Sequence, residues 1–106
     1  MYDTDIFIYS NMAMSVMERE VKLLKALADE TRIRIVQCLL NGNQCACALV
    51  PLVGRAQPTV SQHLRILQEA GVLRARREGI NIRYEIESEE AIQIMEILHM
   101  KKIEAI

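Results

Sequence analysis

The sequence has no tryptophan, few aromatic residues and no long apolar run. Only 4% of its 106 residues are aromatic, so aliphatic side chains and six methionines must fill the core. No apolar stretch approaches the ~18 residues that a membrane span requires. The N-terminus carries Asp3 and Asp5 where a signal peptide carries Lys or Arg. We therefore expect a cytoplasmic protein with no membrane partner.

Cysteine is also scarce. The three cysteines, Cys38, Cys45 and Cys47, cannot all pair within one chain. This count predicts free thiols in a reducing compartment rather than a disulfide framework. The sequence contains neither a glycine-rich phosphate loop nor a convincing pair of catalytic carboxylates, so we do not expect an enzyme.

The remaining composition is that of one small globular domain, with 51% hydrophobic and 25% charged residues. A chain of this length buries limited surface by itself, which favours an oligomer. We divide it into a lead-in of residues 1–14, without an assigned structure, and one domain over residues 15–106.

Apolar spacing and capping residues predict a mainly helical fold with one β-hairpin. Ser15 and Glu18 fit a capping box at the start of the first helix. Ser88 caps the last helix, with Lys101 and Lys102 near its end. The predicted helices are residues 15–28, 29–40, about 47–53, 58–70 and a final helix after Ser88, with hairpin strands at 73–77 and 80–87.

The third and last helices carry further constraints. Proline costs little in the first helical turn but ~3 kcal/mol in a helix interior, so Pro51 predicts a start near Cys47 or Ala48. Cys45 and Cys47 then lie on the segment leading into that helix. The last helix is apolar on more than one face, which predicts a second copy of the chain to cover it.

Positive charge is concentrated in one segment, although the net charge is only −1. Between Gly54 and Tyr84 there are six Arg against two Glu, and the rest of the chain is acidic. A basic segment inside an acidic protein indicates a polyanionic partner.

The order of elements around this segment is that of a winged helix-turn-helix. Two short helices are joined by residues 54–57, and an arginine-rich hairpin follows. Polar side chains on the N-terminal half of the second helix fit the major groove of duplex DNA. Arg76, Arg77 and Arg83 of the hairpin can contact phosphates or a narrow minor groove.

These residues resemble the ArsR/SmtB family of winged-helix repressors. The resemblance covers roughly residues 21–98 and is most specific at Ser61-x-His63-Leu64-x-x-Leu67 and at residues 70–73. It implies a homodimer joined through the first and last helices, bound to an imperfect inverted repeat in its own promoter and released by an effector.

The same resemblance assigns DNA-reading positions to five residues, and the polar helical face adds Arg65. His63 has an alternative role as a structural histidine beside the turn. The family positions are Gln57, Thr59, Ser61, Gln62 and His63.

Cys45 and Cys47 fall where soft-metal sensors of the family carry a Cys-x-Cys. Paired thiolates select As(III), Sb(III), Cd(II), Zn(II) or Cu(I) over hard cations, as effectors rather than as requirements for folding. Residues i and i+2 of a regular helix point to opposite sides, so both sulfurs hold one ion only if this turn is extended or unwinds. Our hypothesis is that chelation deforms the start of the third helix and tilts the DNA-reading helices of the dimer out of register with successive major grooves.

The third ligand is open. The arsenic pattern of the family places a cysteine where this chain has Val50. Cys38, a small thiol or no ligand at all are the alternatives. We do not expect the family's other zinc site, on the last helix, because Lys101 occupies one of its positions.

Two competing functions remain. The first keeps the DNA-binding repressor but switches it by oxidation or persulfidation of the cysteines. The second is a thiol-based metal carrier or oxidoreductase, which lacks the usual Cys-x-x-Cys spacing and an acid–base partner.

Overall fold

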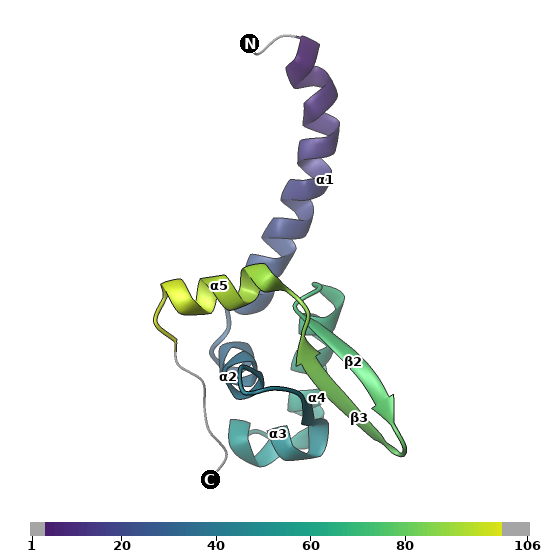
Figure 1. Cartoon of the computed structure of the whole chain (residues 1–106), viewed down its shortest axis with the longest axis vertical. Coiled ribbons are helices and arrows are strands. Elements are labelled where there is room, and N and C mark those ends of the chain that lie inside the picture. Colours follow the sequence, from purple (N-terminus) through teal and green to yellow (C-terminus); the bar gives the residue numbers. More distant parts are fainter. Residues whose placement is uncertain (1–3, 101–106) are drawn as a thin grey trace.

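The computed structural model describes residues 4–100, with side chains from residue 16 onward. Within these residues five helices pack beside a small antiparallel sheet whose hairpin projects from one edge of the body, and the first helix extends away from the body (Figure 1). The elements are α1 Thr4–Leu27, α2 Glu30–Leu39, β1 Gln44–Cys45, α3 Ala46–Val53, α4 Gln57–Glu69, β2 Leu73–Glu78, β3 Asn81–Ile86 and α5 Glu89–Ile97. The mainly helical winged fold predicted from the sequence is confirmed.

The first helix is longer than predicted. It already begins at Thr4, so Ser15 lies inside α1 and the capping box predicted there is wrong. Most of the lead-in, residues 4–14, is therefore helical. The pattern was misread because Ser and Glu at this spacing also occur inside helices, where their side chains face solvent.

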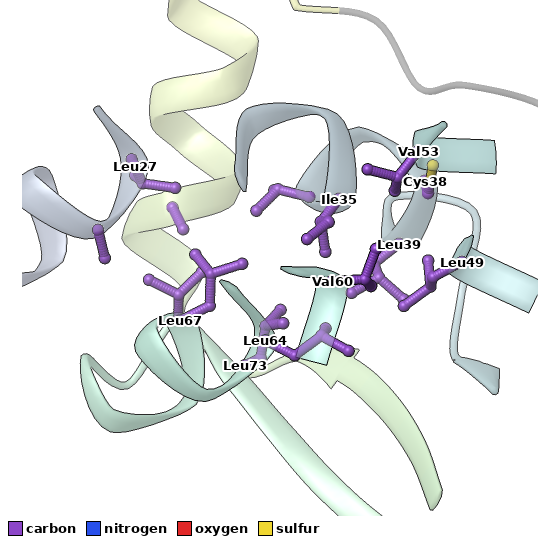
Figure 2. Close-up of a cluster of buried hydrophobic side chains, with 14 of the residues drawn as sticks. Leu27, Ile35, Cys38, Leu39, Leu49, Val53, Val60, Leu64, Leu67 and Leu73 are labelled. Atoms are coloured by element: carbon purple, nitrogen blue, oxygen red, sulfur yellow. The ribbon is translucent and has the colours of Figure 1, made fainter. Parts of the chain in front are cut away.

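One aliphatic core holds α2, α3 and α4 together and joins them to the hairpin. Ile35 of α2, Leu49 of α3 and Leu64 of α4 are each almost fully buried and meet in it (Figure 2). Ala91 and Met95 attach α5 to the same core. Helices α2, α3 and α4 are thus fixed to one another by close packing.

The cap predicted for α5 is confirmed, and α2 has a side-chain cap that was not predicted. Asp29 accepts a hydrogen bond from the backbone N–H of Arg32, and Ser88 accepts one from that of Ala91. Lys101 and Lys102 lie outside the described residues. Helix α5 ends at Ile97, and His99, two residues later, has a positive φ of 56°.

Gly71 ends α4 as predicted. Its φ of 80° is in the left-handed region, and its N–H donates to the carbonyl of Gln68 while that of Val72 donates to Leu67. This closes the last turn and starts the chain directly into β2. The C-terminal end of α4 and the start of the hairpin are therefore held together.

The sheet has one strand that the sequence did not predict. Strand order is β1-β3-β2, with β2 and β3 forming the expected hairpin around Gly79 and Ile80. Gly79 takes a φ of 64°, which suits the first position of a two-residue turn. The two-residue β1 pairs Gln44 with Tyr84 and Cys45 with Arg83. A strand this short leaves no alternating pattern to detect.

Pro51 lies inside α3, contrary to prediction. The helix begins at Ala46, so Pro51 is its sixth residue and cannot donate to the carbonyl of Cys47. Cys45 ends β1 and caps α3, while Cys47 is helical. The cysteine pair is thus part of a strand–helix junction and not of a frayed lead-in.

Candidate nucleic-acid interface and cysteine site

The outer face of α4 presents the predicted reading residues. Gln57, Ser61, Gln62 and Arg65 are exposed, and Thr59 is half-buried. On the opposite side Val60, Leu64 and Leu67 are buried in the core, which fixes how far the helix is rotated about its axis. The polar face is therefore held toward solvent by the packing of the apolar one.

His63 differs from its neighbours on α4. Its side chain is only 18% exposed, and its Nδ1 lies 3.1 Å from a terminal nitrogen of Arg32 and 3.9 Å from a carboxylate oxygen of Asp29. Since the guanidinium of Arg32 can only donate, Nδ1 is the acceptor in this contact. The structure thus places His63 between α4 and the start of α2, in the position of the structural alternative.

Arg32 and Asp29 complete this junction. Arg32 Nε donates to the carbonyl of Ala26 at 2.5 Å, which links the end of α1 to α2. The hydrogen bond from the backbone N–H of Arg32 lowers the pKa of Asp29 below its ordinary value, and the charge of Arg32 adds to this effect, while burial opposes it. The cluster holds the N-terminal end of α2 against α4.

The wing arginines point in different directions. In the hairpin, side chains directly opposite share a face, so Arg76 lies on the face of Arg83 and Arg77 on that of Ile82. Arg76 and Arg77 are exposed. The side chain of Arg83 is 33% exposed and bonds within the molecule, its Nε donating to Oδ1 of Asn43 at 2.6 Å.

Two further arginines near the candidate interface differ in whether their charge is paired within the molecule. Arg74 pairs across the hairpin with Glu85, its Nε donating at 2.9 Å, which raises the pKa of Arg74 and lowers that of Glu85. Arg55, which sequence reasoning did not select, is exposed in the turn just before α4. Its position in the turn before α4 is the sequence feature that could have identified it. Arg55 therefore joins the candidate phosphate contacts.

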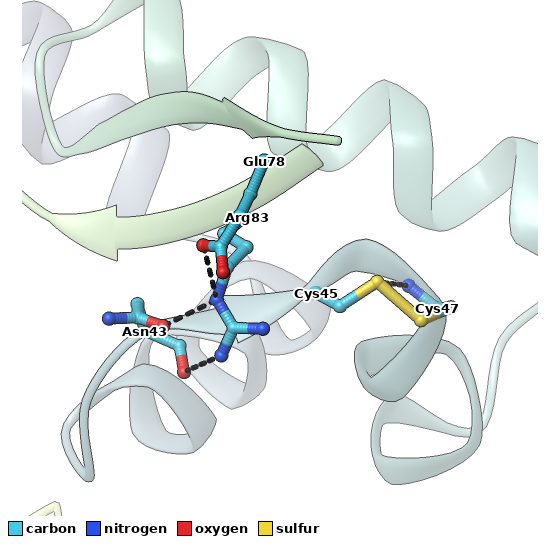
Figure 3. Close-up of a disulfide and its surroundings, with 5 residues drawn as sticks. All are labelled: Asn43, Cys45, Cys47, Glu78 and Arg83. Atoms are coloured by element: carbon cyan, nitrogen blue, oxygen red, sulfur yellow. Dashed lines mark hydrogen bonds and ion pairs between the residues drawn. A yellow bond between two sulfur atoms is a disulfide. The ribbon is translucent and has the colours of Figure 1, made fainter. Parts of the chain in front are cut away.

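Cys45 and Cys47 form a disulfide, contrary to the expectation of free thiols (Figure 3). Cys45 has extended backbone, with φ −68° and ψ 144°, and the two Cα atoms are 5.2 Å apart. Its Sγ also accepts the N–H of Cys47 at 3.3 Å. The extended turn required for both sulfurs to meet is therefore already present, without any unwinding of α3.

Cys38 lies apart from this pair. It is buried in the core, near Val53 in Figure 2, and burial raises the pKa of its thiol while Arg34 opposes the shift. Within the described part of the chain, no three Cys, His, Asp or Glu side chains gather in a way that could hold a metal. Cys45 and Cys47 supply two soft donors, and the structure does not bring Cys38 to them as a third.

A further surface lies far from the cysteines, on α1 and α5. Exposed apolar side chains of the described residues gather there: Val16, Met17, Val21, Leu24, Ile97 and Leu98. A groove of about 710 Å³ runs between α1, the end of α4 and the start of α5. Over residues 4–100, no helix is both long enough and apolar enough to cross a membrane.

Comparison with known proteins identifies the family. Residues 29–75 match the bacterial regulatory protein, arsR family. A cadmium resistance transcriptional regulatory protein CadC homolog of Staphylococcus aureus is 34% identical over 80% of this chain and 73% of its own length. This chain belongs to the ArsR family. As the resemblance implied, it is a transcriptional regulator of the ArsR/SmtB type, and the relatives that it matches are regulators rather than enzymes.

One further sequence relative and one solved structure are similar to this ArsR-family chain. The arsenical resistance operon repressor of Escherichia coli strain K12 is 40% identical over 62% of this chain and 57% of its own length. The homodimeric winged helix-turn-helix DNA-binding domain of a possible ArsR-family regulator from Mycobacterium bovis superimposes with a TM-score of 0.76. It shares 26% identity and covers 82% of this chain and 81% of its own. The DNA-binding fold is thus shared along most of the chain.

Proposed function

We propose that this chain is a homodimeric repressor that reads an imperfect inverted repeat with the N-terminal half of α4. The observation that carries the proposal is the exposed row Gln57, Ser61, Gln62 and Arg65, held outward by the buried stripe of the same helix. Side chains of these types hydrogen-bond base edges in the major groove. Arg76 and Arg77 of the wing then contact the flanking phosphates.

The dimer is supported by the apolar surface of α1 and α5. Leu24 of α1 and Leu98 at the end of α5 are both exposed. Helix α5 lies beside the C-terminal end of α1 (Figure 1). A second copy related by a two-fold axis at this surface covers both helices, and the dimer presents two copies of α4 to one duplex. Reading two successive major grooves requires recognition helices about 34–36 Å apart.

The effector site is the Cys45–Cys47 pair. When the disulfide is reduced, two neighbouring thiolates at an extended turn, with Cys47 exposed, suit a soft metal or metalloid ion such as As(III), Sb(III) or Cd(II). The relatives that regulate cadmium and arsenical resistance support this class of effector. Occupation of the pair lowers affinity for the operator.

The test measures affinity for a duplex selected from a random pool, with and without arsenite or Cd²⁺, in fully reduced protein. C45S with C47S keeps operator affinity and loses the response, and thiolate-to-metal absorption disappears with it. C38A, the matched cysteine control, responds normally because its sulfur lies in the core. Normal release by the double variant contradicts the assignment.

The disulfide favours one second candidate, a redox switch at the same pair. Two thiols lose two electrons and two protons to an oxidant such as hydrogen peroxide, which is reduced to water as the S–S bond forms. Release by peroxide in metal-free buffer, reversed by a dithiol reductant, supports this candidate. Release by metal alone excludes it.

A further inference from the structure

The side chain of Arg83 in β3 contacts the segment before β1 and the neighbouring strand β2. Its Nε donates to Oδ1 of Asn43, and a terminal nitrogen donates to the backbone carbonyl of the same residue at 3.3 Å. The Nε also lies 3.6 Å from a carboxylate oxygen of Glu78, across the hairpin (Figure 3). Arg83 therefore ties the segment before β1 to both strands of the wing.

The same arginine lies directly opposite the effector cysteine. Cys45 pairs with Arg83 in the register of β1 and β3, so the two residues share a sheet face. Cys45 is also the cap of α3 and one half of the disulfide. Cys45 is thus at once a strand residue, a helix cap and a member of the cysteine pair. A chemical change at its sulfur can therefore affect both the sheet and the start of α3.

The pairing between β1 and β3 is short. Only Gln44 and Cys45 pair with β3, whereas β2 pairs with it along six residues. The contacts of Arg83 with Asn43 supplement this small ladder at the point where it begins. Cys45 forms one of the two pairs of this ladder, so the ladder depends on Cys45 keeping its extended conformation.

We propose that Arg83 is a switchable DNA contact controlled by the cysteine pair. When Cys45 and Cys47 are bridged, as in this structure, Asn43 and Glu78 hold the guanidinium away from DNA. When the pair is open, β1 loosens and Arg83 exchanges these partners for a phosphate, with which a guanidinium forms a stronger charge-assisted pair than with an amide. This inference rests on the proposed function and adds the route from effector to wing.

The salt dependence of operator binding tests the proposal. The probe is phenylarsine oxide, whose arsenic bonds to both sulfurs while its oxygen leaves as water with the two thiol protons. In reduced wild-type protein we expect the slope of log affinity against log salt to fall by about 1 per protomer on bridging, because one phosphate contact is lost. R83A lowers the slope by the same amount in the reduced protein and by nothing in the bridged protein.

N43A gives the decisive comparison. Without the amide, Arg83 keeps only the backbone carbonyl of residue 43 and Glu78 as partners in the bridged protein, so the slope changes less on bridging than in wild type. Arsenic still binds one to one. N81A, an asparagine of the wing outside the Arg83 contacts, retains the wild-type change. Hydrogen exchange provides a readout without DNA: the amide of Tyr84 exchanges more slowly after bridging in wild type than before.

The outcomes separate the two proposals. If bridging leaves wild-type affinity unchanged, the proposed effector function fails. If wild type responds and N43A responds equally, or R83A lowers the slope equally in both states, the effector function stands and the role of Arg83 is wrong. Thermal melts of each reduced variant establish that it is folded.

Discussion

Ser61 and Gln62 are the residues whose side chains most directly test base reading. Both are exposed on α4 and neither contributes to the core. We expect S61A or Q62A to weaken specific binding by roughly 1–3 kcal/mol, since one hydrogen-bonded base contact is lost, with an unchanged melting temperature. Fluorescence anisotropy with the selected duplex measures the loss.

A control for this prediction lies on the same helix. Gln68 is equally exposed but near the C-terminal end of α4, away from the reading half. Q68A is expected to bind as wild type does. Equal losses in Q62A and Q68A would show that the N-terminal half has no special part in recognition.

Asp29 gives a pH-dependent prediction for stability. It caps α2, so D29A is expected to lower the free energy of unfolding by about 0.5–2 kcal/mol at pH 7, and D29N by less. Because folding lowers the pKa of Asp29, the stability owed to its charge is complete above its unfolded pKa of about 3.9 and is lost as pH falls through the folded value.

Urea unfolding of wild type and D29N between pH 7 and pH 3 measures this effect. The stability difference between them is expected to close toward acid, because Asn at the cap does not titrate. A difference that stays constant over the whole range contradicts the role of the carboxylate charge.

Single residues differed in how well the sequence predicted them. The outward position of Ser61, Gln62 and Arg65 followed from helical spacing, which depends only on neighbours along the chain. The contact of His63 with Arg32 and that of Arg83 with Asn43 did not. These pairs are 31 and 40 residues apart, and the packing of α2 and β1 creates them.

The wing is the element whose charges are expected to contact phosphates. Arg76 and Arg77 are exposed, whereas Arg74 is paired with Glu85 on the same hairpin. R76A or R77A is expected to weaken binding to all sequences alike and to reduce the salt slope by about 1 per protomer. R74A serves as the control, with little change in slope. Salt titrations that show the reverse order contradict this account of the wing.

Element boundaries failed where local patterns were short or ambiguous. Helix α1 lacked a clear apolar stripe before Ser15, so its start at Thr4 was missed. Strand β1 consists of two residues and exists because β3 supplies its partner. The penalty for an interior proline suggested a later start for α3, yet the burial of Leu49 and Val53 and the cap at Cys45 outweigh it.

At the scale of the whole molecule, the proposed dimer depends on the apolar surface of α1 and α5. Leu24 is 53% exposed there. L24D is expected to yield monomers, because a carboxylate cannot be buried without a partner, and to reduce operator affinity at least tenfold. Light scattering after size exclusion measures the mass. I80D is the control, since Ile80 is 97% exposed at the tip of the wing, away from both helices. If L24D remains a dimer, the proposed interface is wrong.

Selection of duplexes from a random pool tests the central claim most directly, because the selected sequences themselves report how the protein reads DNA. Two copies of α4 on one dimer are expected to enrich an inverted repeat whose half-sites are centred 10–10.5 base pairs apart, about one helical turn. The enrichment is expected to be weaker with Q62A and unchanged with Q68A. Recovery of single, unrepeated sites, or of no preferred sequence at low salt, would contradict the account.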